Sequence, residues 1–214
     1  ANLSEENLEA LAKGMPNLYK HIENIKHVYK KPVVVAMNRF ASDTPAEIEF
    51  VMRGVEKAGA KAVFTDVFLQ GGEGGKELAE AVCEAAMQKS ELHYSYDLND
   101  SIEKKISDIV KNVYGGAGAS FSEIAKEKIA EAEARGYGRL PVIIAKTQYS
   151  LSDDAKLLAR PEGFTVHVRD IIVKGGAEFV VAIAGNIMLM PGLGKVPAAE
   201  HIGVDEKGEI FGLS

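Results

Sequence analysis

Cysteine is almost absent from this sequence, since Cys83 is the only one among 214 residues. A single cysteine excludes an internal disulfide, and it excludes the cysteine clusters that hold structural zinc. The histidines have no metal-like spacing relative to one another or to this cysteine; they are His21, His27, His93, His167 and His201. We therefore expect no metal site, and we expect a reducing, cytoplasmic location.

Long hydrophobic runs are also missing. The longest apolar stretch covers residues 179–187 and is broken by Gly185 and Asn186. It is about half as long as the ~20 residues that a membrane-spanning helix requires. The first residues lack the apolar centre of a signal peptide. The sequence therefore predicts no membrane partner.

Basic residues do not dominate the charge. The chain has 25 lysines and arginines against 31 aspartates and glutamates, which gives a formal net charge of −6. Nucleic-acid surfaces need clustered positive charge to displace counterions, so this balance argues against a nucleic-acid partner. Hydrophobic residues at 46% and charged residues at 26% are typical of a globular protein. A chain of this length suits one large or two small domains.

The first half of the chain begins with a helix pattern and a strand pattern. Residues 3–29 have the apolar spacing of an amphipathic helix, with Ser4 as its N-cap and a bend near Pro16. Residues 32–37 are wholly apolar and rich in β-branched side chains. Such a run is typical of a strand that is buried on both faces of a parallel sheet.

The same alternation continues to residue 89. The segment TPAE at 44–47 is a capping box with proline at the first helical position, and Gly59 ends the helix it begins. Residues 61–68 have the pattern of a second strand, residues 71–75 that of a glycine loop, and residues 76–89 that of another helix. Together these segments predict a β-loop-α-β-loop-α unit of an open α/β sheet.

The pattern changes in the second half. Residues 91–97 resemble one further strand, and helices begin near Asp100 and Ser120. From Pro141 onward the chain is rich in strands, and a hairpin turn at Gly175-Gly176 joins the last two of them. We place domain boundaries near residue 95 and near residue 138.

The glycine loop nearly matches a phosphate-binding loop. Residues 70–77 read QGGEGGKE, with Gln70 where G-x-x-x-x-G-K-[ST] requires glycine and Glu77 where it requires a hydroxyl. Glu73 would bring a carboxylate to the place where backbone N–H groups should face phosphate. We therefore expect that this loop does not hold a triphosphate.

Ligands of open α/β sheets lie beyond the carboxyl ends of the strands. Two loops, over residues 38–44 and 68–75, are therefore expected to border one crevice. Phe40 and Phe68 begin these loops, and they either stack on a flat heterocycle or pack under their own loops. Asp43 and Thr44 either serve the helix that follows or contact a ligand. The other candidate crevice residues are Asn38, Gly71, Gly72 and Glu73.

A catalytic group is not evident. The sequence contains no G-x-S-x-G motif, and Cys83 lies on the apolar face of its helix. The residues alone therefore predict a ligand crevice without a nucleophile.

Several segments together resemble the carboxyl-terminal portion of the formate–tetrahydrofolate ligase family, also called 10-formyltetrahydrofolate synthetases. They are NLYKHIENI at 17–25, VVVAMNRF at 33–40 with Asp43-Thr44, GGEGG at 71–75, AKTQYS at 145–150, and MPGL at 190–193 leading to PAA at 197–199. The resemblance runs in order over essentially all 214 residues. Phe68, Ala41 and Gly194 stand where this family commonly has tryptophan, proline and proline.

The resemblance implies a reaction in which ATP with Mg²⁺ phosphorylates formate, and formyl phosphate then gives its formyl group to N10 of tetrahydrofolate. Phe40 and Phe68 then correspond to the aromatic pair that stacks on the pterin ring. The implied fold is the carboxyl-terminal part of a P-loop-type parallel α/β sheet domain, followed by a smaller α+β domain. The implied divisions are a nucleotide and folate part over 1–95, a helical connector over 96–138 and a β-rich carboxyl-terminal domain over 139–214.

The family's phosphate loop and its catalytic cations belong to an amino-terminal segment without a counterpart here. By resemblance we expect this chain alone to be inactive, that segment to be its partner, and the complete enzyme to be a homotetramer. A second hypothesis is a non-catalytic folate-binding or assembly module. A third, an unrelated α/β protein with a similar crevice, is disfavoured by the ordered motifs.

Overall fold

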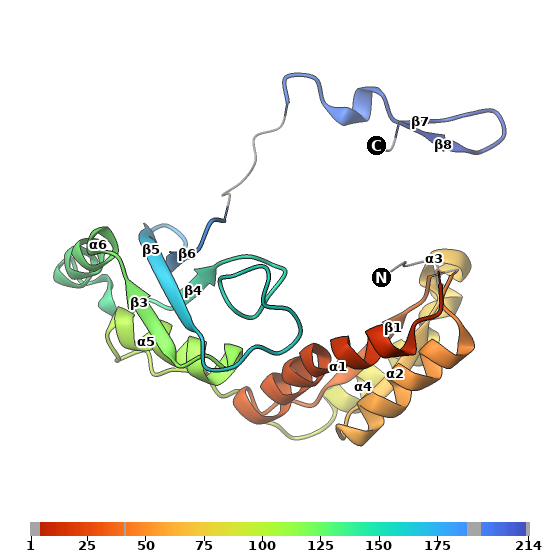
Figure 1. Cartoon of the computed structure of the whole chain (residues 1–214), viewed down its shortest axis with the longest axis horizontal. Helices are drawn as coiled ribbons and strands as arrows, with labels where there is room; N and C mark the ends of the chain where they lie inside the picture. Colours follow the sequence, from red (N-terminus) through yellow and green to blue (C-terminus); the bar gives the residue numbers. More distant parts are fainter. Residues whose placement is uncertain (1–4, 41, 188–193, 213–214) are drawn as a thin grey trace.

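The computed structural model describes residues 5–40, 42–187 and 194–212. It shows an amino-terminal lobe built around two strands and a second lobe built around four strands, with helix α1 (Leu8–Glu23) extending from one toward the other (Figure 1). Most strand pairs are parallel, so the predicted mixed α/β class is confirmed.

The amino-terminal lobe is a two-stranded parallel sheet with the helices α1, α2 and α4 and the one-turn helix α3 (Val67–Gln70). Val34 pairs with Lys61 at one end of the sheet, and Asn38 pairs with Thr65 at the other. Helix α1 continues as a π-helical turn, η1 (Asn24–Val28). The other main elements are β1 (Val34–Asn38), α2 (Pro45–Lys57), β2 (Lys61–Thr65) and α4 (Lys76–Ala86).

The predicted capping box is confirmed at the start of α2. The Thr44 hydroxyl accepts a hydrogen bond from the Glu47 amide at 3.3 Å, and the Glu47 carboxylate accepts one from the Thr44 amide at 3.2 Å. The same carboxylate accepts a bond from the Asn7 amide at 2.9 Å. Glu47 therefore ties the beginnings of α1 and α2 together.

Helix α1 begins later than expected. Its N-cap is Asn7, whose side chain accepts a bond from the Ala10 amide. The predicted cap, Ser4, lies outside the described residues. Pro16 stands inside the helix without ending it.

Strand β2 is shorter than predicted. It ends at Thr65, and a one-turn helix, α3 (Val67–Gln70), and a 3-10 segment, η2 (Gly71–Gly75), follow. The parallel ladder stops there because β1 ends at Asn38, and the Arg39 amide makes the last bond, to the Thr65 carbonyl at 3.3 Å. The expected strand over 91–97 is also absent from the structure, and helix α4 ends at Ala86 rather than residue 89.

Strand β1 is not buried on both faces, contrary to the expectation from its apolar sequence. Its residues are half-buried, apart from Ala36 and Asn38, which are exposed. The strand pairs with β2 alone within the described residues, so its other edge has no neighbour there.

The second lobe contains a four-stranded mixed sheet in the order β3-β5-β6-β4. The pairs β3–β5 and β4–β6 are parallel, while β5 and β6 form the predicted hairpin around Gly175-Gly176. The elements are α5 (Ile102–Ile109), η3 (Val110–Tyr114), β3 (Gly118–Phe121), α6 (Glu123–Ala134), η4 (Tyr137–Arg139), β4 (Val142–Ala145), β5 (Thr165–Lys174) and β6 (Phe179–Ala184).

Helices α5 and α6 bury their apolar faces on this sheet. The shared core includes Ile102, Ile106, Ile129, Val168, Ile171 and Val180. The helices begin one and two residues later than predicted, with Ser101 and Ser122 as N-caps. Their hydroxyls accept bonds from Lys104 and Ala125 amides, as Ser N-caps commonly do.

Lys105 is fully buried in this core. Its ammonium group donates to the carbonyl oxygens of Gly138 at 2.6 Å and Leu140 at 3.1 Å. Burial lowers the pKa of Lys105, since a charged group is harder to accommodate away from water. The side chain links α5 to the segment between α6 and β4.

Polar side chains of α1 and η1 join the two lobes. Asn17 donates to the Ala159 carbonyl at 3.0 Å, and Asn24 donates to the Val113 carbonyl at 2.8 Å. Glu23 forms an ion pair with Arg160, with 2.9 Å between carboxylate oxygen and guanidinium nitrogen. We call this contact region the lobe junction.

The carboxyl-terminal segment, residues 194–212, contains η5 (Ala198–Glu200) and a small antiparallel hairpin of β7 (Gly203–Val204) and β8 (Ile210–Phe211). The motif at 190–193 and Ala41 lie outside the described residues. Among the residues that the structure does describe, no helix combines the length and apolar character needed to cross a bilayer.

The lobe junction should weaken in acid. Burial acts to raise the pKa of Glu23, but Lys20 and Arg160 outweigh it, so that its pKa lies below the ordinary value. A carboxylate with a lowered folded-state pKa stabilises the fold above its unfolded pKa of about 4.3, and this contribution is lost as the pH falls through the folded value. We expect Glu23→Gln to lower the free energy of unfolding at pH about 7, and the difference from wild type to shrink below pH about 4.

Urea unfolding at both pH values measures this difference. Glu162→Gln is the matched control, because Glu162 contacts the same Arg160 at 3.4 Å but is 71% exposed. If both variants lost the same free energy of unfolding at neutral pH, the proposed contribution of Glu23 to the lobe junction would be contradicted.

Candidate functional site

The carboxyl ends of β1 and β2 lie at one edge of the amino-terminal sheet, because Asn38 and Thr65 are paired there. The segment after β1 and the segment after β2 therefore leave the sheet side by side. We use crevice only as a name for this edge, which comprises residues 38–44 and 66–75.

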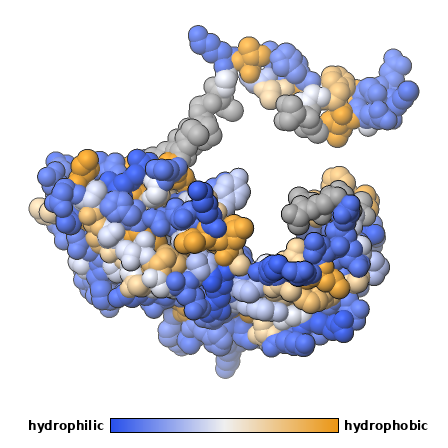
Figure 2. All heavy atoms as spheres, in the orientation of Figure 1, coloured by the Kyte–Doolittle hydropathy of each residue, from blue (hydrophilic) through white to orange (hydrophobic). Residues whose placement is uncertain are grey.

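Two aromatic rings stand out at this edge. Phe40 is 67% exposed and Phe68 is 88% exposed. The sequence left open whether these rings pack under their own loops. In this structure neither of them does. Phe68 belongs to α3 rather than to the end of a strand, and its neighbour Leu69 is also exposed. Figure 2 shows apolar residues beside charged ones at the α3 end of this lobe.

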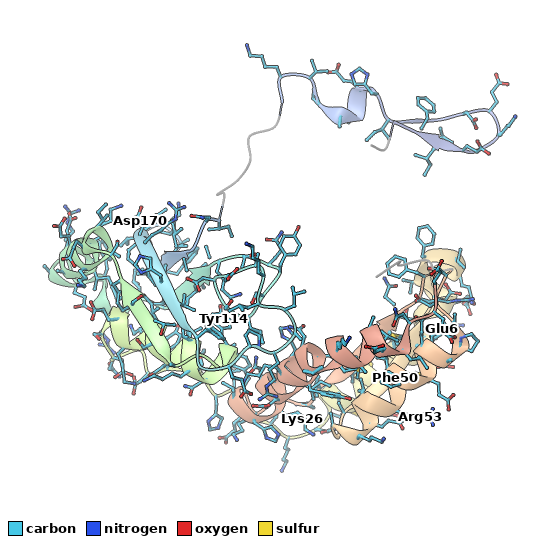
Figure 3. The ribbon with its side chains drawn as sticks, in the orientation of Figure 1. Glu6, Lys26, Phe50, Arg53, Tyr114 and Asp170 are labelled. Carbon is cyan, nitrogen blue, oxygen red and sulfur yellow. The ribbon has the colours of Figure 1, made fainter. Side chains whose placement is uncertain are left out.

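Asp43 shapes the loop that carries Phe40. Its carboxylate accepts a hydrogen bond from the Phe40 amide at 2.8 Å, and its own amide donates to the Phe40 carbonyl at 3.1 Å. These two bonds close a tight turn. Thr44 caps α2, and its hydroxyl donates to the Glu6 carboxylate at 2.6 Å (Figure 3 labels Glu6). Both residues thus serve local structure.

Asp66 is the functional candidate that sequence reasoning missed. It is 5% exposed and follows β2 directly. Its carboxylate accepts a hydrogen bond from the Gln70 amide group at 3.1 Å and forms an ion pair with Arg39 at 3.5 Å. An acidic residue directly after an apolar strand is a signal that could identify Asp66. The sequence-based prediction misses it because the predicted strand continues to residue 68 and includes Asp66.

Arg39 crosses from the end of β1 to the end of β2. Besides its contact with Asp66, its guanidinium lies 6.0 Å from the centre of the Phe64 ring, within the range of a cation–π contact. The neighbouring Thr65 hydroxyl is buried and has no hydrogen-bond partner among the described residues. The crevice floor therefore combines one buried carboxylate, one guanidinium and one unpaired hydroxyl.

The glycine loop packs closely on this floor. The Asp66 amide donates to the Gly74 carbonyl at 3.1 Å. A Cβ atom at Gly74 would lie 2.4 Å from the Asp66 carbonyl oxygen, so a side chain does not fit without moving the backbone. At Gly72 nothing lies within 4 Å of the corresponding position.

The loop does not present its lysine for phosphate binding. Lys76 forms an ion pair with Glu73 at 2.5 Å, and both side chains are exposed. Glu73 thus neutralises the residue that would contact phosphates in a phosphate loop. Within the described residues, no group of three or more histidine, cysteine, aspartate or glutamate side chains is placed to hold a metal ion.

The sequence model of the formate–tetrahydrofolate ligase family matches residues 1–214. The match covers both lobes and both crevice loops, and it confirms the resemblance found in the sequence motifs.

The crevice geometry predicts that Gly74 and Gly72 differ in their tolerance of a side chain. Gly74→Ala must displace the backbone at Asp66, and strain of this kind in a packed region costs about 1–3 kcal/mol. Gly72→Ala meets open space and should change the free energy of unfolding by less than about 0.5 kcal/mol. Urea denaturation of both variants tests this, and equal stabilities would contradict the close packing of η2 on Asp66.

Proposed function

The chain belongs to the formate–tetrahydrofolate ligase family, and from this premise we propose that its crevice binds the pterin ring of tetrahydrofolate. Members of this family join formate to tetrahydrofolate at the expense of ATP. The family match is the observation that supports this reaction. The two exposed rings at the carboxyl edge of the sheet support the part that we assign to this chain.

Phe40 and Phe68 are the proposed stacking residues. A ring that is mostly exposed in a folded protein leaves apolar area in water, and covering that area with a flat heterocycle is favourable. Offset stacking adds about 0.5–1.5 kcal/mol for each aromatic pair. Phe40 comes from the loop after β1 and Phe68 from α3, which follows the neighbouring strand β2. In this proposal the two rings contact opposite faces of one ligand.

The floor of the crevice has a positioning role in this proposal. The Asp66–Arg39 contact joins the ends of β1 and β2, and the Gln70 contact joins α3 to the same carboxylate. Asp43 fixes the loop of Phe40 in a similar way. Loops that are held before binding lose less conformational freedom on binding, which favours affinity. Asn38, Gly71 and Gly72 complete the proposed wall.

The chemistry that we propose for the complete enzyme proceeds through formyl phosphate. Formate attacks the γ-phosphorus of Mg²⁺-bound ATP and releases ADP, and N10 of tetrahydrofolate then attacks the formyl carbon and releases phosphate. Such phosphoryl transfer depends on cations that neutralise the developing charge. The sequence does not complete the motif G-x-x-x-x-G-K-[ST], and Lys76 is paired with Glu73. We therefore assign folate binding, and not phosphate binding, to these 214 residues.

The assembly and location of the enzyme are part of the same proposal. We expect a homotetrameric, cytoplasmic enzyme whose phosphate-binding segment adjoins the crevice. The division into residues 1–95, 96–138 and 139–214 also stays a proposal. In the structure, residues of the middle range supply α5, β3 and α6, which pack with β4, β5 and β6. The alternative function is a folate-binding or assembly module without catalysis, which the incomplete phosphate motif favours.

Folate binding should depend on the two rings. Phe40→Ala removes one stacking surface, and we expect the dissociation constant of tetrahydrofolate to rise about tenfold. Phe68→Trp enlarges the other surface and should lower that constant. Tyr94→Ala is the control, because Tyr94 is 68% exposed but lies outside the crevice. Calorimetric titration under reducing, anaerobic conditions measures all three, and unchanged affinity for Phe40→Ala would contradict the stacking proposal.

Turnover by the 214-residue chain should not occur. We expect no ATP-dependent formation of 10-formyltetrahydrofolate, because phosphoryl transfer requires cations around the phosphates and the sequence does not complete the phosphate-loop motif. Absorbance of the cyclised product in acid is a suitable readout. Activity that disappears in the Phe40→Ala variant would overturn this prediction, because a contaminating enzyme would not respond to that change.

A further inference from the structure

Two cavities are relevant here: a smaller one of about 440 Å³ beside η1, and a larger one of about 520 Å³ at the lobe junction. This junction cavity, about 520 Å³, is bounded by Gly14, Asn17 and His21 of α1, and by Tyr114 and Ala159 of the second lobe. The segment 146–151 that follows β4 closes it. In Figure 3 the labelled Tyr114 lies where the second lobe faces α1. Two motifs of the sequence, at 17–25 and 145–150, meet here, and the crevice uses neither.

The lining of the junction cavity is polar and carries no carboxylate. Its side chains include an ammonium, an imidazole, two amides and two hydroxyls that carry donor groups: Lys146, His21, Asn17, Gln148, Thr147 and Tyr149. The nearest acidic residue of α1, Glu23, is paired with Lys20 and Arg160. The electrostatics of the lining therefore favour an anion.

Lys146 is held in place at this cavity. Its ammonium donates to the carbonyl oxygen of Thr147 at 3.2 Å and to that of Ser150. It also lies 4.9 Å from the centre of the Tyr114 ring, which suits a cation–π contact. An ammonium has three protons, so one donor remains for a ligand.

The segment that carries Lys146 is ordered by its own hydrogen bonds. The hydroxyls of Ser150 and Ser152 lie 3.0 Å apart, and the Ser150 hydroxyl donates to the Leu157 carbonyl at 2.5 Å. Ser152 is fully buried. A cavity wall of this kind is formed before a ligand arrives.

We propose that the junction cavity binds a small organic anion, whose carboxylate or phosphate is held by the Lys146 ammonium and whose body lies against Tyr149. Its volume is within the range of about 300–1,000 Å³ that is common for small-molecule sites, so it suits an organic molecule better than a bare inorganic ion. Tyr149 is 68% exposed at the rim, and its ring offers apolar area to such a body.

Binding of an anion would have two consequences. Burial lowers the pKa of Lys146, although the charge of Asp153 opposes this shift. A bound anion would favour the charged ammonium, and binding would therefore be coupled to its protonation. Because residues of both lobes border the cavity, a ligand there should also stabilise the lobe junction against unfolding.

Amide NMR spectra of the isotope-labelled 214-residue chain test the site. The probes are citrate for the carboxylate arm, glycerol 3-phosphate for the phosphate arm, inorganic phosphate for size, and glycerol as the neutral control. We expect saturable shifts at residues 14–21 and 145–151 with either organic anion, weaker shifts with inorganic phosphate, and none with glycerol. Whether citrate or glycerol 3-phosphate causes the shifts identifies the anionic group, carboxylate or phosphate, that the site prefers.

Three variants assign the contacts. Lys146→Met should weaken binding of the responding probe about tenfold or more, as expected for a lost hydrogen bond to a charged group. Lys146→Met also leaves the carbonyl oxygens of Thr147 and Ser150 without their donor, which could disturb the segment. Variants at two exposed residues, His21 and Tyr149, therefore provide independent tests. His21→Leu and Tyr149→Ala should weaken binding severalfold, whereas their controls His27→Leu and Tyr94→Ala, which lie outside the cavity lining, should not.

The lysine-rich surface beside η1 is an internal comparison, because Lys26, Lys30 and Lys31 border the smaller cavity. Shifts that appear there and not at the junction, or no saturable shifts with either organic anion, would overturn the proposal. Inorganic phosphate binding as tightly as both organic probes would contradict the part of it that concerns the ligand body. The Phe40→Ala variant should bind these anions as wild type does, so failure of the folate proposal would be seen separately.

Discussion

The packing of the two lobes depends on the unpaired carbonyl groups at the end of η3. A helix leaves its last carbonyl oxygens without intrahelical partners, and burying them without hydrogen bonds is costly. Lys20 and Asn24, both nearly fully buried, donate to the carbonyl oxygens of Asn112 and Val113. Gly115 then ends the helix in a left-handed conformation. One end of α1 and the following η1 thus bond to the second lobe, while the other end bonds to α2 through Asn7 and Glu47. The junction cavity and the crevice are therefore connected through α1 and α2.

Local signals in the sequence were sufficient for much of this scaffold. The capping box at Thr44 and Glu47 determines where α2 begins from four adjacent residues, and the structure contains it as expected. The end of β2 was not predictable in this way. Val67 and Phe68 are apolar and extend the predicted strand to residue 68, but a ladder extends only as far as its partner strand, and β1 ends at Asn38. The length of β2 is therefore a property of the pair, and the role of Asp66 was missed for the same reason.

Burial was harder to predict than secondary structure. A wholly apolar β-branched run is typical of a strand with neighbours on both sides. Strand β1 has the run, yet it has one neighbour and is only half-buried within the described residues. An apolar edge of this kind promotes association. The apolar sequence of β1 therefore does not by itself determine how deeply the strand is buried.

The glycines of η2 show why a motif needs its geometry before its chemistry is assigned. Glycine-rich loops beside a lysine are typical of phosphate sites, where backbone N–H groups face the ligand. Here the closest approach at Gly74 is to the carbonyl oxygen of Asp66, an acceptor that would repel phosphate. The lysine is neutralised by Glu73. The absence of a side chain at Gly74 allows the loop to approach the backbone of Asp66, the residue whose carboxylate contacts Arg39 and Gln70. The close contact at Gly74 is therefore made with the protein's own backbone, while Phe40 and Phe68, the stacking residues that we propose, stay exposed.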